Sequence, residues 1–334
     1  MVVAATKELR TGPALQRAAR AYAQEDRGRT WRLLFVTCVV LFGCEAVTAL
    51  APWWPVRIGA MVIAGLTSVR MFIFLHDHLH GAILRDSPVG KAIMWLYALY
   101  CLNPASVWRE THDYHHRNNA KMLGGSIGSF PVVTRRMWSA MKPGQRRLYK
   151  FVRHPLNMTF GYFTIFIGGL CLSSFMRRPK VHWQGPLAIV FHFGIAALVS
   201  YGTGEWYAGI MAVMVPQMIA CGLGSYLFYA QHNFPEIQLR DRRNWDYQFA
   251  ALNSSSMFDM NGVMHWFTGN IGYHHVHHLN HRIPFYRLPE AMEALPELQV
   301  PGRTSWRPRD IAACLALQVW DPRQKRMISF AELG

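Results

Sequence analysis

The sequence predicts an all-α integral membrane protein, a helical bundle with a helical cap on the cytoplasmic side. Two observations indicate this fold class: apolar runs recur along the chain, and several connectors between them are strongly basic. About 20 residues of α-helix cross the hydrocarbon core of a bilayer, and the first two runs and the last have that length. Six runs are too many for a soluble domain of 334 residues. They cover residues 31–51, 56–75, 92–107, 158–176, 186–201 and 206–230.

The first two runs are expected to cross the membrane out and back. Residues 1–30 are polar and basic, so we expect a cytoplasmic N-terminal segment followed by an anchoring span, not a cleaved signal peptide. A short Pro-Trp-Trp-Pro turn at 52–55 joins the runs and returns the chain to the cytoplasm. Lys and Arg accumulate in cytoplasmic loops. They cluster before the first run and after residue 116, at Lys7, Arg10, Arg17, Arg20, Arg27, Arg29 and Arg32, and at Arg117, Lys121, Arg135, Arg136, Lys142, Arg146, Arg147, Lys150 and Arg153.

The remaining runs divide into segments that cross and segments that do not. The connector 177–180 is basic and is expected in the cytoplasm, whereas the connector 202–205 is expected outside. Residues 158–176 then have both ends in the cytoplasm, so this run is re-entrant or lies in the membrane plane. Residues 186–201 and 206–230 form an out-and-back hairpin, and 92–107 stays on the cytoplasmic side. We therefore expect four crossings and two embedded segments that do not cross.

The C-terminal third is expected to form the cytoplasmic cap, because residues 231–334 contain no run long enough to span a membrane. Within it, the leucines and methionine of 283–298 recur at helical spacing, which predicts an amphipathic helix. The chain divides into a basic N-terminal segment (1–30), a membrane domain (31–290) and a C-terminal extension (291–334).

A net charge of +16 is better explained by anionic membrane lipids than by nucleic acid, because the basic residues flank apolar spans. An acidic redox partner is a further alternative. The six cysteines form no Cys-x-x-Cys pair, and most of them lie in apolar runs, so we expect small buried side chains.

Three histidine clusters predict a metal site. If helical, the first places two histidines one turn apart, and the second and third repeat an i, i+3, i+4 pattern on one helix face. Neutral imidazole binds iron, copper, zinc and nickel. Eight such ligands outnumber those of one tetrahedral zinc, so two metals are expected. Four crossings also place all three clusters on the same side of the membrane. The ligand candidates are His76, His80, His112, His115, His116, His274, His277 and His278.

The residues around these clusters resemble the histidine boxes of membrane fatty-acid desaturases, in particular the bacterial and plastid acyl-lipid branch. The resemblance covers roughly residues 31–290 and is most specific around the third cluster. The motifs are His76-Asp77-His78-Leu79-His80-Gly81, Trp108-Arg109-Glu110-Thr111-His112-Asp113-Tyr114-His115-His116, Gln231-His232, Trp266-Phe267-Thr268-Gly269-Asn270-Ile271-Gly272-Tyr273, His278-Leu279 and Arg282-Ile283-Pro284.

The resemblance implies a non-haem di-iron site that uses O2 to remove two hydrogens from a fatty-acyl chain that is linked to a lipid. It assigns iron ligation to the eight box histidines and adds His232 as a ninth ligand. Asn270, four residues before His274, could contact a metal directly or through water. Asp77 and Asp113 are candidate acceptors for imidazole N–H groups. Outside the ligand set we place the remaining histidines: His78, His275, His265, His154, His182, His192 and His281.

Desaturation is one of several activities that this scaffold supports. An unactivated methylene has no acidic proton and no leaving group, so a redox metal must activate O2. Hydroxylation, carbonyl formation and acetylenation, including a carotenoid ketolase, remain alternatives. A histidine-rich metal transporter is a second alternative, but transporters place their ligands near the middle of the spans, whereas these clusters lie at span ends. The sequence has no Rieske pair, nucleotide-binding fingerprint or cytochrome haem motif, so we expect an external electron donor such as ferredoxin.

The substrate must bring a mid-chain methylene to metals at the ends of the spans. We expect an apolar tunnel with walls from residues 56–75, 92–107 and 206–230. Leu96, Tyr97 and Tyr100 share one side of the predicted 92–107 segment and are the candidates for the tunnel wall. The alternative is that all three are ordinary lipid-facing or interfacial side chains.

Overall fold

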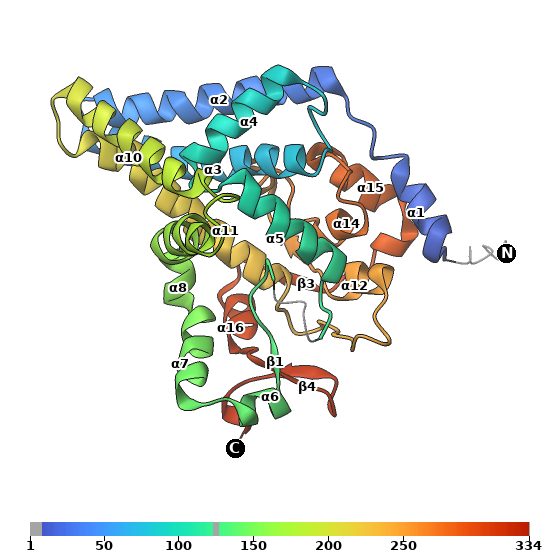
Figure 1. Ribbon diagram of the computed structural model, residues 1–334. Helices are drawn as coiled ribbons and strands as arrows, with labels where there is room; N and C mark the ends of the chain where they lie inside the picture. The colour runs from blue at the N-terminus through green and yellow to red at the C-terminus, as the bar shows by residue number, and fades with distance from the viewer. Residues whose placement is uncertain (1–8, 123–126, 334) are drawn as a thin grey trace.

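The computed structural model describes residues 9–122 and 127–333. Within this part of the chain, four helices are long and apolar enough to cross a membrane. They are α2 (Arg27–Leu50), α3 (Trp54–Leu79), α10 (Gln184–Thr203) and the continuous pair η2 (Ile210–Met214) and α11 (Val215–Gln231). Figure 1 shows these helices extending to one side of the molecule, with the smaller helices and strands gathered on the other. The predicted membrane helical bundle is confirmed.

Local sequence explains where the first two long helices begin and end. The Asp26 side chain caps α2 by accepting a hydrogen bond from the backbone N–H of Arg29. Pro55 occupies the first turn of α3, where a missing N–H costs nothing. Helix α3 continues four residues past the predicted end of its apolar run. The first histidine cluster therefore lies on the last turn of the helix itself.

The prediction of one continuous segment at residues 92–107 is wrong. Helix α4 (Pro88–Tyr100) ends in a turn where Leu102 has a φ of +56°, and α5 (Ala105–Asn118) begins after Pro104. Proline disfavours helical backbone in the residue before it, so the apolar run cannot continue as one helix. The chain turns back at this point, and α5 carries the second histidine cluster away from α4.

The run predicted at 158–176 is irregular and shorter than the four long helices. It comprises α8 (Pro155–Thr159), the π-helix η1 (Tyr162–Ser173) and α9 (Ser174–Arg177). Its longest apolar stretch, Tyr162–Arg177, falls below the length of the four candidate spans. Helix α8 packs against α11, and η1 packs against α10. This segment packs beside the bundle, and its failure to cross the membrane stays a prediction.

The remaining elements form what we call the cap, residues 105–122, 127–154 and 232–333. Its helices besides α5 are α6 (Arg135–Ala140), α7 (Pro143–Val152), α12 (Tyr247–Asn253), α13 (Gly262–Phe267), α14 (His274–Leu279), η3 (Phe285–Arg287), α15 (Leu288–Ala294), η4 (Pro296–Leu298), α16 (Pro308–Ala316) and η5 (Ala331–Leu333). The helix predicted at 283–298 is divided into η3, α15 and η4, because Pro296 lacks the N–H that would continue α15. Leu288, Leu295 and Leu298 are nevertheless buried.

Short strands join the C-terminal extension to the rest of the cap. Strand β2 (Met257–Asp259) pairs in parallel with β3 (Arg303–Ser305). A second sheet has the order β1 (Val133–Thr134), β4 (Val319–Asp321) and β5 (Arg326–Ile328). At the other end of the chain, α1 (Gly12–Arg20) lies beside the cap, and Arg10 forms an ion pair with Glu297 at 2.7 Å. Figure 1 shows α1 beside α14 and α15.

Candidate metal centre

Four helix ends bring the histidine clusters together. The last turn of α3 supplies His76 and His80, α5 supplies the second cluster, and α14 supplies the third. His232 follows directly after the last residue of α11. The ring nitrogens of these residues form two groups, and within each group the candidate ligand atoms lie within 4.8 Å of one another. The first group is His76, His80, His112, His116 and His277, and the second is His115, His232, His274 and His278.

The two groups contain all nine histidines predicted as ligands. Neighbouring Nε2 atoms are separated by distances that suit a shared ion: His116 to His112 is 3.0 Å, His277 to His116 is 3.1 Å, and His274 to His232 is 2.8 Å. Two nitrogens at the about 2.1 Å typical of imidazole–zinc bonds, placed at a right angle, are about 3 Å apart. The buried Nε2 of His80 has no hydrogen-bond partner within the described residues. The donor set therefore fits a metal ion in each group.

Burial keeps the imidazoles in the form that binds metals. Burial, followed by the proximity of other imidazoles, lowers the pKa of His274, His277 and His278 well below the usual range. Burial also lowers the pKa of His232 to about 4, against the opposing effect of the Ser254 carbonyl. These rings are neutral at physiological pH, and a neutral ring nitrogen offers a lone pair to a metal.

Of the two predicted carboxylate acceptors, the structure places one in contact with a ligand candidate. Asp77 Oδ1 is 2.9 Å from His76 Nδ1, and its Oδ2 accepts the backbone N–H of Phe285 at 2.7 Å. Asp113 does not make such a contact: its carboxylate is 3.9 Å from His80 Nδ1. On α5, Asp113 lies between the histidines that share the inner face, so its side chain points off that face.

The helical spacing behind the Asn270 prediction is not realised, and a contact of this residue with a metal stays a prediction. Asn270 lies in the turn between α13 and α14 with a φ of +55°, so the four-residue helical spacing to His274 is not realised. Its Nδ2 donates to the Phe285 carbonyl at 3.2 Å. Asn tolerates left-handed backbone better than most residues, and its side chain fastens this turn to the segment before α15.

The other seven histidines lie outside the groups, as expected. His275 faces the Leu298 carbonyl at 3.1 Å and His78 faces the Ile83 carbonyl at 3.3 Å. His281, which the sequence placed outside the ligand set, lies beside the first group, with its ring centroid 4.7 Å from that of His80. It belongs to neither group, and its Nδ1 has no partner among the described residues. The sequence feature that indicates this proximity is the position of His281 four residues after His277, although α14 ends at Leu279.

An apolar cavity of about 490 Å³ reaches both histidine groups. His76 and His112 of the first group and His274 of the second contribute to its wall. The rest of the lining comes mainly from α3, α4, α5, η1 and α11, including Phe72, Ile73, Cys101, Phe166, Leu227 and Phe228. A long apolar ligand in this cavity would pass both groups.

One of the three tunnel candidates lines this cavity. Tyr97 is part of the wall, and its hydroxyl donates to the Ser68 carbonyl at 2.8 Å. Leu96 is 46% exposed on the outer side of α4, because consecutive residues of a helix point about 100° apart. Tyr100 points toward α2, where its hydroxyl donates to Glu45 at 2.6 Å. Leu96 and Tyr100 are therefore not wall residues.

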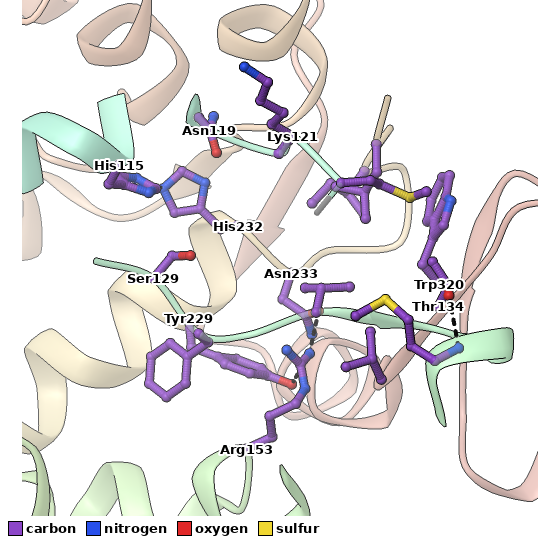
Figure 2. A pocket seen from close by; sticks show the side chains of 18 residues that line it. His115, Asn119, Lys121, Ser129, Thr134, Arg153, Tyr229, His232, Asn233 and Trp320 are labelled. Atoms are coloured by element: carbon purple, nitrogen blue, oxygen red, sulfur yellow. Dashed lines mark hydrogen bonds between the residues drawn. The ribbon is translucent and has the colours of Figure 1, made fainter. Parts of the chain in front are cut away.

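A second, smaller cavity of about 60 Å³ approaches the second histidine group from the cap. Figure 2 shows His115 and His232 on one side of it and Arg153 on the other. Arg153 is buried and donates to the Asn233 side-chain oxygen at 2.7 Å and to the Tyr229 hydroxyl at 3.0 Å. The wall of this cavity is more polar than that of the large one, so the two cavities suit different molecules.

Nine imidazoles, eight of them buried and one half-buried, lie beside an apolar cavity at the ends of long apolar helices. This arrangement defines a membrane protein with a metal centre for a hydrophobic substrate. The family model for fatty acid desaturases matches residues 52–309, and the chain belongs to this family. It is therefore an enzyme, an oxidoreductase of the membrane fatty acid desaturase class.

Similar proteins come from bacteria and plastids. A fatty acid desaturase of Bacillus subtilis (strain 168) is 26% identical over 322 residues, covering 95% of this chain and 90% of the relative. An sn-1 oleoyl-lipid 12-desaturase of Picosynechococcus is 22% identical, covering 80% of this chain and 77% of the relative. An sn-1 acyl-lipid omega-3 desaturase (ferredoxin) of Nostoc is 24% identical, covering 67% of this chain and 63% of the relative. These similarities favour lipid desaturation over metal transport.

Proposed function

We propose that this enzyme introduces a double bond into the acyl chains of membrane lipids, with O2 as co-substrate and one iron held by each histidine group. The observation that carries the proposal is that a single apolar cavity touches His76 and His112 of one group and His274 of the other. An acyl chain in the cavity would lie against both groups along its length.

Different residues of the chain would have different roles in this reaction. The nine histidines would hold the two ions, and Asp77 orients the His76 ring through the 2.9 Å contact with Nδ1. Bound iron supplies the O2 chemistry that an unactivated methylene requires. The apolar wall excludes water and positions the chain. Burial of each methylene stabilises the bound chain by roughly 0.8 kcal/mol.

Electrons for this reaction would come from a separate protein. Removing two hydrogens with O2 forms two waters and consumes two electrons and two protons. The relative from Nostoc carries ferredoxin in its name, and a small acidic donor of that kind would be attracted to the basic segments of the cap. Because basic segments favour the cytoplasm, we place the histidine groups and the donor site on that side.

Lipid analysis of an expressing host tests the proposal. A host that makes only saturated lipids should accumulate monounsaturated acyl chains when it expresses this chain, and purified protein should contain about two irons per chain with no haem absorption band. A hydroxylated product without a double bond would favour the hydroxylase alternative. A haem spectrum, or the absence of any oxidised lipid despite full iron content, would contradict the proposal.

A further inference from the structure

The large cavity has its mouth on the segment between α7 and η1. Among the described residues that line it, only Phe151 and Thr164 are exposed. Every other described lining residue is buried or half-buried. Phe151 lies in the last turn of α7, and Thr164 lies in the first turn of η1. The cavity therefore opens sideways, at the flank of the bundle where α8 packs against α11.

The surface around this mouth is apolar. Leu148, Leu156, Phe160 and Phe163 are all exposed large hydrophobic side chains on α7, α8 and η1. Several exposed apolar side chains on consecutive elements indicate a protein or membrane contact. This surface adjoins α10 and α11, two of the candidate membrane spans. The continuity of the patch with these spans favours the bilayer as its covering, so the mouth faces lipid.

A basic residue of α7 lies next to the mouth. Arg147 precedes Phe151 by four residues. Residues four apart share a helix face, so Arg147 and Phe151 are neighbours on the surface of α7. Arg147 is exposed and pairs with no carboxylate in the part of the chain that the structure describes. The ammonium of Lys150, by contrast, lies over the Phe330 ring, 5.0 Å from its centroid. A helix with apolar and basic residues together suits the boundary between acyl chains and anionic headgroups.

We propose that the acyl chain enters sideways from the bilayer, between Phe151 and Thr164, while it remains attached to a phospholipid whose anionic headgroup is held by Arg147. This inference rests on the proposed desaturation of lipid-linked acyl chains. It adds the class of substrate, which is an intact anionic phospholipid. A substrate carried by a water-soluble protein or cofactor would need a mouth open to water, and the experiments separate these two cases.

Photocrosslinking tests the entry route without turnover. Purified protein in vesicles of phosphatidylglycerol that carries a diazirine on its acyl chain is irradiated, and the modified peptides are identified by mass spectrometry. We expect adducts on the cavity wall in η1 and α11. Phe151→Trp should narrow the mouth and cause loss of these adducts. Phe160→Trp is the matched control, because Phe160 is 54% exposed, Phe151 is 52% exposed, and only Phe151 lines the cavity.

Headgroup recognition is tested by the rate of desaturation in two kinds of vesicle. Arg147→Gln should lower the rate about fivefold in phosphatidylglycerol vesicles, the effect of losing one cation near an anionic surface, and should leave the rate in phosphatidylcholine vesicles unchanged. Arg242→Gln removes an exposed cation from another loop and should change neither rate.

The outcomes distinguish this inference from the proposed function. Cavity adducts without any unsaturated product would contradict desaturation and leave the entry route standing. Desaturation with unchanged adducts in Phe151→Trp would overturn the entry route. A higher rate on a soluble acyl carrier than on vesicle lipid would overturn the phospholipid substrate.

Discussion

Asp77 supports the candidate metal centre through two hydrogen bonds, and its substitution should weaken both metal binding and folding. The carboxylate is 2.9 Å from His76 Nδ1 and 2.7 Å from the Phe285 backbone nitrogen, and the residue is 1% exposed. Asp77→Asn keeps the shape but removes the charge and replaces one acceptor oxygen by an N–H donor. Hydrogen bonds to charged groups contribute about 1.5–3 kcal/mol. Carboxylate partners of ligating histidines contribute about 10–100-fold in metal affinity.

We therefore expect Asp77→Asn to lower the free energy of unfolding by about 1.5–3 kcal/mol and to weaken Fe²⁺ binding by about 10–100-fold. Anaerobic competition with a chromophoric chelator measures the affinity, and denaturant titration of the detergent-solubilised protein without metal measures the stability. Asp113→Asn is the matched control, because its carboxylate is 3.9 Å from His80 Nδ1 and its side chain is 41% exposed. Equal losses in the two variants, or wild-type affinity in Asp77→Asn, would refute the reasoning.

Three further predictions follow from the same structure. His232→Ala should reduce iron content and abolish desaturation, whereas the exposed His154→Ala should retain both; full activity without His232 would remove it from the ligand set. Tyr97→Ala should enlarge the cavity and shift the products toward longer chains in a lipid profile, whereas Leu96→Trp, on the outer side of α4, should not. A membrane-impermeant thiol reagent applied from outside should label Thr203→Cys and not Arg178→Cys; the reverse pattern would overturn the predicted orientation.

The long helices and the ligand candidates could be predicted because their signals are local. A run of about 20 apolar residues has few alternatives to a spanning helix. The His112, His115 and His116 spacing also places three rings on one face wherever that helix packs. His232 is different, because nothing local distinguishes it from His192. It was assigned by resemblance to a family, and the structure places it in the second group.

Features that depend on backbone turns could not be predicted from the apolar pattern. The run at 92–107 has the composition of one buried segment, but the turn before Pro104 divides it and redirects α5. At Asn270, helical spacing failed because the left-handed backbone of Gly269 and Asn270 separates α13 from α14. In both places, one or two residues with left-handed backbone precede the next helix and set where it begins. That helix carries a histidine cluster.

The rotation of helix α4 about its own axis also could not be predicted from the sequence. Leu96, Tyr97 and Tyr100 are close on α4, yet one lies on the outer surface, one lines the cavity and one bonds to Glu45 of α2. Because α4 is apolar on most sides, its sequence offers no polar face that would fix this rotation. Only the positions of α2, α3 and α10 determine which side of α4 faces the cavity.

The composition of the cavity wall bears on how the position of the double bond is selected. Within the described residues, no Asp, Glu, Lys or Arg lines the large cavity. No carboxylate, lysine or arginine of this described wall is therefore available to select the reacting carbon. Burial alone does not select it either, since an acyl chain moved by one methylene along an apolar wall buries nearly the same area. The position of the acyl chain along the wall must therefore be set at its two ends. The headgroup is held at the mouth beside Phe151, and the methyl end lies against the deep wall that includes Tyr97.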